Sequence, residues 1–466
     1  MDATVDTQWR KEQRRRAQAR ANALLEEGVD GVALSYVDNA GVTRVKAVPV
    51  ARLPHAAAWG VGMSPVFDVF CVDDSITAGR LAGGPAGDLR LHPDLDRLVR
   101  LAGQPGWAWA PVDRFTQDGR EHPGCQRSFA RRAADRAAAA GLDVRMGFEI
   151  EWVVGSDTGG GPGADFAAAC RGPAYGMTRM VELGDYCRDL LTALAEQSVE
   201  VLQLHPEYAA GQFELSAAPL APVAAADQVL LVRETVRAVS RRHGMEATFA
   251  PVVVAGAVGN GQHLHLSLRR DGVNLLADGP GRYGITAVGE SFLAGILGAL
   301  PALTAILAPS VPSHLRLVPS TWAGAYRCWG RENREAALRL VTGSTGETRE
   351  AANAEVKCLD ASANPYLVVG AVLDVGLAAL DAGLVLPEEV PGDPAALAPG
   401  DLERLGVERL PRSVAEALDH LDASELLTDA LGEYLCDAFT AVRRAEAALF
   451  ADRTPAEVVA ATRWRY

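Results

Sequence analysis

Secretory and membrane-spanning features are missing from this 466-residue sequence. Its seven cysteines are dispersed and form no Cys-x-x-Cys pair, which is typical of reduced thiols in a cytoplasmic protein. The N-terminus, MDATVDTQWRKEQRRR, is charged and has no apolar core of the kind that a signal peptide needs. The longest apolar run, 292–307, contains glycine and Pro301 and is short for a membrane span. We therefore expect a cytoplasmic protein with no membrane partner, in which this run forms a buried helix.

A basic surface is missing as well, because the net charge at pH 7 is −14. Such a charge disfavours nucleic-acid binding, so we expect no nucleic-acid partner. The glycine-rich turn at 256–262, GAVGNGQ, lacks the Gly-x-Gly-x-x-Gly spacing and leads into a predicted strand, which argues against a dinucleotide site. A local group of arginines can still bind an anionic substrate.

The length and the hydrophobic pattern predict two domains, at 1–115 and 116–466. Residues 8–27 predict a helix, and the alternating apolar residues of 31–50 predict a hairpin. The larger domain mixes strands and helices without a regular βαβ rhythm. The predicted class is therefore α+β, with a mostly antiparallel sheet and helices packed on it. Residues 153–164 are rich in glycine and predict a mobile loop.

Two short acidic segments carry most of the functional information. Glu149 and Glu151 lie two residues apart in GFEIEW, which is the period of a strand, so both side chains should point to one face. Glu207 and Glu214 flank a glycine in EYAAGQFE. Converging carboxylates repel each other unless cations neutralise them, and Mg²⁺ and Mn²⁺ prefer oxygen ligands. The pattern predicts a divalent-metal site, with a solvated strand face as the structural alternative.

Two further clusters extend this prediction. His263 and His265 lie two residues apart on a predicted strand and share a face. The pair predicts one metal ligand and one nucleotide contact, and the structural alternative is one core and one surface histidine. Five arginines gather within 24 residues, and arginine binds phosphates and carboxylates through a planar fork, although ion pairs on a surface helix are an alternative. Together the clusters indicate phosphoryl transfer. The five arginines are Arg316, Arg327, Arg331, Arg334 and Arg339.

Five segments are similar in order and spacing to the glutamine synthetase superfamily, and the resemblance covers nearly the whole chain. They are GFEIEW, EYAAGQFEL, GNGQHLHLSL, SHLRLVPSTWAGAYRCWGRENREAALRL and AEVKCLDASANPYL. The resemblance implies a small N-terminal β-grasp-like domain and a large catalytic domain with an antiparallel sheet. It also implies ATP-dependent chemistry, in which the γ-carboxylate of glutamate forms an acyl phosphate that an amine displaces. Family members form rings, so we expect a homo-oligomer, a dodecamer of two hexameric rings with active sites between subunits.

The resemblance also implies residue roles, with ATP and Mg²⁺ (or Mn²⁺) as cofactors. One metal would be held by Glu151, Glu207 and Glu214, and a second, nearer the transferred phosphoryl group, by Glu149, His263 and Glu355. The other carried-over roles are nucleotide binding by His265 and Ser267, glutamate binding by Gly259 and Arg316, phosphate contact and catalysis by Arg334 and Arg339, and a place on the acceptor side for Tyr175.

The most informative departure from the family pattern concerns the amine. Ammonia-using members carry a flap glutamate six residues after the equivalent of Arg316, and this chain has Trp322 there. An indole has no negative charge and cannot act as a base. Its flat apolar face would instead form an acceptor wall for the carbon chain of a larger amine.

Two other departures affect the substrates. The Asp-Gly-Ser-Ser loop of the family is absent from the small domain, and one of Asp68, Asp73 and Asp74 would replace it. Lys357 stands where the family usually has a glutamate-binding arginine, so the charge is kept and the fork is lost. Val258 occupies the position of an asparagine in the glutamate loop, which predicts altered glutamate binding.

With these departures, the chain resembles the glutamine synthetase-like γ-glutamyl-amine ligases, which serve amine assimilation or detoxification. We expect ethanolamine as the acceptor, because the stretch WAGAYRCWGRENREAALR most resembles the ethanolamine-type members. The sequence also reveals no extra carboxylates for the distal ammonium groups of a polyamine. A γ-glutamylpolyamine synthetase acting on putrescine or spermidine is the next alternative. True glutamine synthesis from ammonia and a non-catalytic family relative are further alternatives. Retention of all six predicted metal ligands argues against the last.

Overall fold

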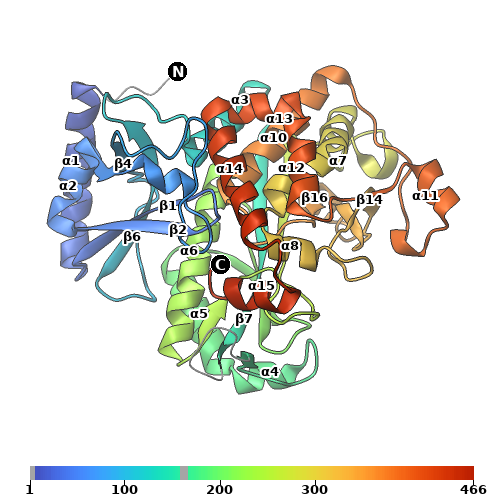
Figure 1. Ribbon diagram of the computed structural model, residues 1–466, viewed down its shortest axis with the longest axis horizontal. Helices are drawn as coiled ribbons and strands as arrows, with labels where there is room; N and C mark the ends of the chain where they lie inside the picture. Colours follow the sequence, from blue (N-terminus) through green and yellow to red (C-terminus); the bar gives the residue numbers. More distant parts are fainter. Residues whose placement is uncertain (1–5, 158–165) are drawn as a thin grey trace.

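The computed structural model describes residues 6–157 and 166–466. Figure 1 shows the N-terminal elements as a lobe beside a larger body that carries the other helices and strands. The predicted loop at 153–164 is wrong for 153–157, which continue strand β7 (Asp143–Asp157). The rest of that loop lies outside the described residues.

The N-terminal lobe is a six-stranded mixed sheet with helices packed on it. The strand order is β2-β1-β6-β4-β3, with β5 on β6, and among the described strands of this lobe only the β1–β6 pair is parallel. Helix α1 begins after Asp6, whose carboxylate accepts the Trp9 N–H, and buries Ala17, Ala21 and Leu24. This arrangement agrees with the predicted β-grasp-like domain, and the boundary at residue 115 stays a prediction. The elements are α1 (Thr7–Glu26), β1 (Gly31–Val37), β2 (Thr43–Pro49), η1 (Val50–Arg52), α2 (Leu53–Trp59), β3 (Val61–Met63), η2 (Pro65–Val69), β4 (Leu89–Pro93), β5 (Val99–Arg100) and β6 (Trp107–Thr116).

The larger body is built on an eleven-stranded sheet within the described residues, in the order β17-β14-β15-β16-β12-β7-β10-β9. Strands β8 and β11 also pair with β7, and β13 pairs with β12. Every pair is antiparallel except β14–β15, which confirms the mostly antiparallel sheet. Besides β7, the strands are β8 (Phe166–Ala168), β9 (Val201–Pro206), β10 (Gln212–Ala217), β11 (Glu246–Thr248), β12 (Gln262–Arg270), β13 (Val273–Asn274), β14 (Tyr326–Arg331), β15 (Ala336–Val341), β16 (Asn353–Val356) and β17 (Glu408–Arg409).

One face of the large sheet is buried in the core by side chains such as Phe148, Ile150 and Leu264. The opposite face carries the predicted metal ligands, so the alternation predicted for GFEIEW is confirmed. The helices are α3 (Gln126–Ala139), α4 (Met177–Glu182), α5 (Gly184–Glu196), α6 (Pro222–Arg242), η3 (Arg282–Gly284), α7 (Ala287–Leu307), α8 (Val311–Arg316), α9 (Thr348–Ala351), α10 (Pro365–Ala382), η4 (Pro394–Ala396), α11 (Pro399–Leu405), α12 (Val414–Asp422), α13 (Glu425–Leu431), α14 (Glu433–Leu449) and α15 (Pro455–Thr462).

Helices α7 and α10 are long and apolar enough to cross a membrane by length and composition. Inside the protein, however, 78% and 72% of their apolar windows are buried, as in core helices. Their close packing needs glycine: a Cβ on Gly376 of α10 would lie 2.4 Å from the ring of Phe292 on α7. The buried helix predicted for 292–307 is confirmed.

The two lobes meet at the tip of the first hairpin and at the start of α10. A Cβ on Gly41 would lie 1.9 Å from the carbonyl oxygen of Ser362, so only glycine allows this approach. Asn364 caps α10 by accepting N–H groups of Tyr366 and Leu367, and its amide donates to the Val37 carbonyl at 3.1 Å. The Asn-Pro-Tyr segment therefore holds the N-terminal lobe against the catalytic sheet.

Candidate active site

Strand register lines up acidic and histidine side chains across the middle of the large sheet. On β12, His263 lies opposite Glu149 of β7. Two residues further along β12, His265 lies opposite Glu355 of β16. Side chains two apart on a strand share a face, so all four groups project from the same side of three adjacent strands.

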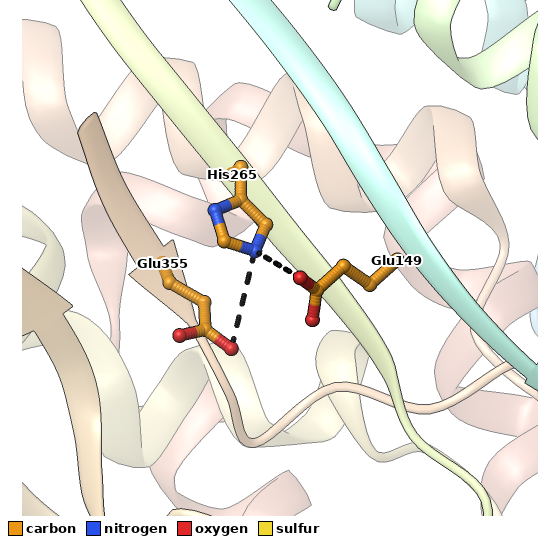
Figure 2. A group of neighbouring side chains, drawn as sticks. All are labelled: Glu149, His265 and Glu355. Carbon is orange, nitrogen blue, oxygen red and sulfur yellow. Dashed lines mark ion pairs between the residues drawn. The ribbon is translucent and has the colours of Figure 1, made fainter. Parts of the chain in front are cut away.

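These four side chains form a compact cluster. Figure 2 shows Glu149, His265 and Glu355 pointing toward one another from three strands. The Nε2 atom of His265 lies 3.3 Å from a Glu149 oxygen and 4.0 Å from a Glu355 oxygen. The Nδ1 atom of His263 lies 3.2 Å from each of the same two carboxylates. Both predicted histidines therefore reach the predicted carboxylate pair.

The two histidines differ in protonation. Burial and the nearby positive charge of Lys357 lower the pKa of His263 to about 4, so its imidazole is neutral at pH 7. Burial also opposes a charge on His265, but its hydrogen bond to Glu149 and the charge of Glu355 raise the pKa of His265 to about 9. A neutral imidazole is the form that binds a metal. Both imidazoles face the carboxylate pair, and ligand atoms of Glu149, His265 and Glu355 lie within 4.8 Å of one another, so the division of roles between His263 and His265 stays a prediction.

A second acidic cluster lies beside the first, on β7, β9 and β10. Glu151 lies opposite Glu214, and Glu214 lies opposite His205 on β9. The Nε2 atom of His205 is 3.2 Å from Glu214, and its Nδ1 atom is 3.7 Å from Glu207. Sequence reasoning missed His205, and the only sequence signal for it is its place two residues before Glu207.

The chemistry of the second cluster fits a hard divalent cation. Burial, and next the negative charge of Glu214, raise the pKa of Glu151 to about 8. Such a shift arises where buried carboxylates converge without enough positive charge among the protein groups. Gln212 orients Glu151, because its Nε2 atom donates to a Glu151 oxygen at 2.9 Å. Oxygen ligands with at most one neutral imidazole match Mg²⁺ or Mn²⁺ better than Zn²⁺.

Metal binding at this cluster should release a proton from Glu151. With a pKa near 8, this carboxyl is mostly protonated at pH 6, and a metal binds only the ionised form. We expect the apparent Mn²⁺ affinity to rise with pH by up to about tenfold per unit, levelling above pH 8. Calorimetry in two buffers of different ionisation enthalpy measures the released proton. Glu151→Gln should abolish this release, and an affinity constant between pH 6 and 8 would contradict the assignment.

A glycine that sequence reasoning missed lies between the clusters. A Cβ on Gly261 would lie 2.5 Å from His263 Nε2, 2.8 Å from Arg316 Nη2 and 2.9 Å from Glu151 Oε1. We expect Gly261→Ala to weaken metal binding by about 10–100-fold, because the predicted ligands must move apart. Gly298→Ala is the control, since a Cβ there meets no atom within 4 Å. Equal metal affinity in the two variants, measured by titration calorimetry, would refute this expectation.

The residues predicted to hold glutamate lie next to these clusters. A Cβ on Gly259 would lie 2.1 Å from the Pro251 carbonyl and 3.0 Å from Arg316 Cγ, so glycine is required for this packing. Arg316 is buried at the end of α8, and its Nη2 atom donates to the Lys357 carbonyl at 3.3 Å. Its Nη1 atom has no hydrogen-bond partner among the described residues. An arginine with such a spare donor is suited to a substrate carboxylate.

Lys357 makes a contact that the sequence did not predict. Its Nζ atom donates to Glu355 at 3.0 Å, and the pair is buried. Burial opposes ionisation of Glu355, but the charge of Lys357, followed by that of His265, lowers the Glu355 pKa to about 2. Lys357 therefore holds a predicted metal ligand in its ionised form, besides any contact with glutamate.

The residues predicted for the nucleotide and phosphates lie in two different settings. Arg339 donates to Glu355 at 3.0 Å and to Glu332 at 2.9 Å, so its guanidinium is fixed beside the first cluster. Ser267 shares the strand face of His265 but makes no side-chain hydrogen bond to a described residue. Arg334 is exposed and has no ion pair with a described residue. Their predicted roles stay predictions.

The predicted acceptor side is exposed. Trp322 is 57% exposed, with a left-handed backbone at φ 60°. Tyr175 is 49% exposed, and its hydroxyl approaches Glu207; burial and that hydrogen bond raise the pKa of Tyr175. These positions agree with residues that line a pocket mouth rather than a core.

The three aspartates offered as a replacement for the missing loop differ in exposure. Asp68 is buried in an ion pair with Arg114 and accepts the Tyr434 hydroxyl at 3.2 Å, so its carboxylate is committed to the fold. Asp73 and Asp74 are exposed, and Asp74 pairs with Arg44 at 2.8 Å. The buried pairing of Asp68 leaves Asp73 and Asp74 more accessible to a substrate, and the choice among the three stays open.

Comparison with known proteins identifies the class. Residues 123–459 match the family profile described as glutamine synthetase, catalytic domain, and residues 19–126 match the glutamine synthetase N-terminal domain. The chain therefore belongs to the glutamine synthetase family. It is 55% identical over 452 residues to the gamma-glutamylpolyamine synthetase GlnA3 of Streptomyces coelicolor, covering 97% of each chain. It is 28% identical to a glutamine synthetase of Clostridium saccharobutylicum, over 91% of this chain and 93% of that one.

Solved structures agree with this assignment. A structure titled as a novel glutamine synthase homolog superposes with a TM-score of 0.83 at 34% identity, covering 94% of this chain and 99% of that one. An ADP complex of GmaS superposes with a TM-score of 0.80 at 26% identity, covering 93% and 96%. The fold and the recognition from sequence are confirmed. The chain is a C–N bond-forming ligase of a family that uses ATP, divalent metals, glutamate and an amine.

Proposed function

We propose that this enzyme joins the γ-carboxylate of glutamate to a polyamine such as putrescine or spermidine, with ATP and Mg²⁺ (or Mn²⁺). The observation that carries the proposal is the 55% identity to a gamma-glutamylpolyamine synthetase over 97% of both chains. The proposal replaces the ethanolamine expected from the sequence. It agrees with the exposed Trp322 at the position where an ammonia-binding carboxylate is missing.

The reaction has two steps. A γ-carboxylate oxygen attacks the terminal phosphorus of ATP, the bond to ADP breaks, and an acyl phosphate forms. The amine nitrogen then attacks the acyl carbon, phosphate leaves, and the amine gives up a proton. Splitting one difficult substitution into two easier ones is the advantage of the phosphorylated intermediate.

Each cluster has a part in this scheme. Glu149, His263 and Glu355 would hold one divalent cation, and Glu151, Glu207 and Glu214 the other. Bound there, the cations would neutralise phosphate charge. Arg339, fixed by Glu355 and Glu332, stands beside the first cluster, where a guanidinium can stabilise developing phosphoryl charge.

The acceptor side would be formed by Trp322 and Tyr175. The aliphatic segments of a polyamine match a flat indole face, and an ammonium group over an aromatic ring is attracted by its quadrupole. Ammonia has neither an alkyl chain to pack nor a flap carboxylate to hold it. We therefore expect ammonia to be a poor acceptor.

Phosphate release with putrescine, spermidine, ethanolamine and ammonia, each with glutamate and ATP, tests the proposal. A higher kcat/KM for a polyamine than for the other amines supports it. Preference for ethanolamine would restore the expectation from the sequence, and preference for ammonia would make the chain a glutamine synthetase in activity. Either result would overturn the polyamine proposal.

We further propose the assembly and compartment expected from the sequence. The enzyme would be a cytoplasmic homo-oligomer, a dodecamer of two hexameric rings whose active sites lie between subunits. The exposure of Trp322 and Tyr175 in the single chain is compatible with a neighbouring subunit that completes the acceptor side. Mass measurement by light scattering tests the ring size, and a monomer with full activity would refute the shared site.

A further inference from the structure

Glu335 is a buried carboxylate directly behind the acceptor wall. It lies between β14 and β15, one residue after Arg334, and is 7% exposed. Its Oε1 atom accepts the backbone N–H of Trp322 at 2.7 Å. A second backbone hydrogen bond, from Ser320, also stabilises the ionised form. No described residue donates to its Oε2 atom. The side chain therefore binds the backbone of the 320–322 loop and little else.

That loop has a backbone that its residues do not favour. Ser320 and Trp322 have φ angles of 58° and 60°, in the left-handed region that favours glycine. A bulky residue stays in such a conformation only where its surroundings hold it. Ser320 is also held by its hydroxyl, which donates to Asp393 at 2.6 Å. For the backbone N–H of Trp322, the carboxylate of Glu335 is the partner.

Glu335 is itself fixed from the opposite side. Its backbone N–H donates to Asn333 Oδ1 at 3.0 Å. The Asn333 amide donates in turn to the carbonyls of Val390 at 2.7 Å and Gly392 at 2.9 Å. The carboxylate is therefore fixed relative to the sheet and can fix the loop. Burial raises the pKa of the Glu335 carboxyl, and the negative charge of Asp393 raises it further, whereas the backbone donors lower it. An apolar residue would avoid this penalty but could not accept the loop N–H groups.

We propose that Glu335 is a positioning residue for the amine acceptor, which acts through the backbone of Trp322 to fix the indole wall. The identity of the acceptor rests on the proposed function, whereas the role of Glu335 in fixing the loop does not depend on it. Glu335 touches the loop and not the amine. Its loss should therefore weaken acceptor binding and leave the phosphoryl-transfer groups in place.

Glu335→Ala and Glu335→Gln test the kinetic part, with the amine that the wild-type enzyme uses best. We expect the acceptor KM to rise about tenfold for Glu335→Ala and less for Glu335→Gln, which keeps the volume and an acceptor oxygen. The turnover number and the KM for ATP should stay within about twofold. Glu12→Gln is the control, because Glu12 is an exposed carboxylate that pairs with Arg15 of α1 in the N-terminal lobe. Equal losses in turnover and ATP affinity would overturn the proposal.

A second background separates positioning from general stability. In Trp322→Gly the wall is absent and glycine adopts the left-handed backbone without strain, so adding Glu335→Ala should change the acceptor KM less than about twofold. The same fold-change in both backgrounds would overturn the proposal. If Glu335→Ala does not fold, Glu335→Gln supplies the comparison in both backgrounds.

Hydrogen exchange tests the loop without reference to any amine. In Glu335→Gln, we expect amide exchange across 318–325 to be faster than in wild type by at least about threefold, and exchange on β7 and β12 to be unchanged. Unchanged exchange across 318–325 would overturn the positioning role, whichever amine the enzyme uses. A failure of the polyamine proposal alone would alter the acceptor panel and leave this result intact.

Discussion

Replacing His263 with alanine is expected to lower the turnover number on the order of 10²–10³-fold, while the melting temperature changes little. The neutral imidazole lies 3.2 Å from both Glu149 and Glu355. Its loss would leave the two carboxylates with one ligand fewer for the cation that we propose they bind. Because His263 carries no charge at pH 7, its removal strands no buried counter-ion. Phosphate release at saturating substrates, alongside thermal unfolding, measures both effects.

His92→Ala provides the opposite control. His92 is also buried, and burial lowers its pKa to about 4, but it lies in the N-terminal lobe with Nδ1 3.0 Å from the Ala57 carbonyl. Its loss should lower the melting temperature and leave turnover within a few-fold of wild type. Parallel loss of stability and turnover in His263→Ala would contradict a dedicated metal role. Glu355→Ala is a poorer test, because it would leave the buried Lys357 ammonium unpaired and destabilise the fold.

Trp322→Glu is expected to raise kcat/KM for ammonia by at least about tenfold and to lower it for polyamines by a similar factor. A carboxylate there can accept the proton of an ammonium ion, which an indole cannot. The same change removes the flat apolar face that we assign to the alkyl chain. The left-handed backbone at this position suits glutamate no worse than tryptophan, so the loop should persist.

The control for this substitution is Trp59→Glu. Trp59 is 45% exposed at the end of α2 and lies against Arg10, far along the chain from the site segments. It should leave the ratio of ammonia to polyamine activity unchanged. The assignment of Trp322 fails if both variants shift that ratio equally, or if Trp322→Glu leaves it at the wild-type value.

Strand periodicity accounts for the part of the site that was predictable. Glu149 with Glu151, and His263 with His265, lie two residues apart, and strands β7 and β12 place each pair on one face. Which residues meet across strands depends on register, which one sequence does not reveal. The register of β9 with β10 brings His205 to Glu214, and this histidine was therefore missed.

Loops account for most of what was not predictable. Gly261 matters because three functional side chains surround its missing Cβ, and Glu335 matters because a distant loop reaches it. Neither the contacts around Gly261 nor the contact of Glu335 with the loop leaves a local pattern in the sequence. The burial of Asp68 was not predictable for a related reason, since its pairing with Arg114 depends on how η2 and β6 pack.

The acceptor was the least predictable feature. The absence of a carboxylate at Trp322 argues against ammonia, but it does not distinguish ethanolamine from a polyamine. That distinction depends on the shape and charge of the acceptor pocket, to which the exposed Tyr175 and Trp322 are assigned as a prediction. The polyamine proposal therefore draws on the 55% identical relative rather than on residue chemistry alone.

One competition experiment tests the central claim most directly. The enzyme is given ATP, Mg²⁺, glutamate labelled with ¹⁸O in its γ-carboxylate, and equal concentrations of ¹⁵N-ammonium, ethanolamine, putrescine and spermidine. Mass spectrometry then identifies the γ-glutamyl products and the label in phosphate. We expect a γ-glutamylpolyamine as the main product and one ¹⁸O atom in each phosphate released. Glutamine as the main product, or phosphate without ¹⁸O, would contradict it.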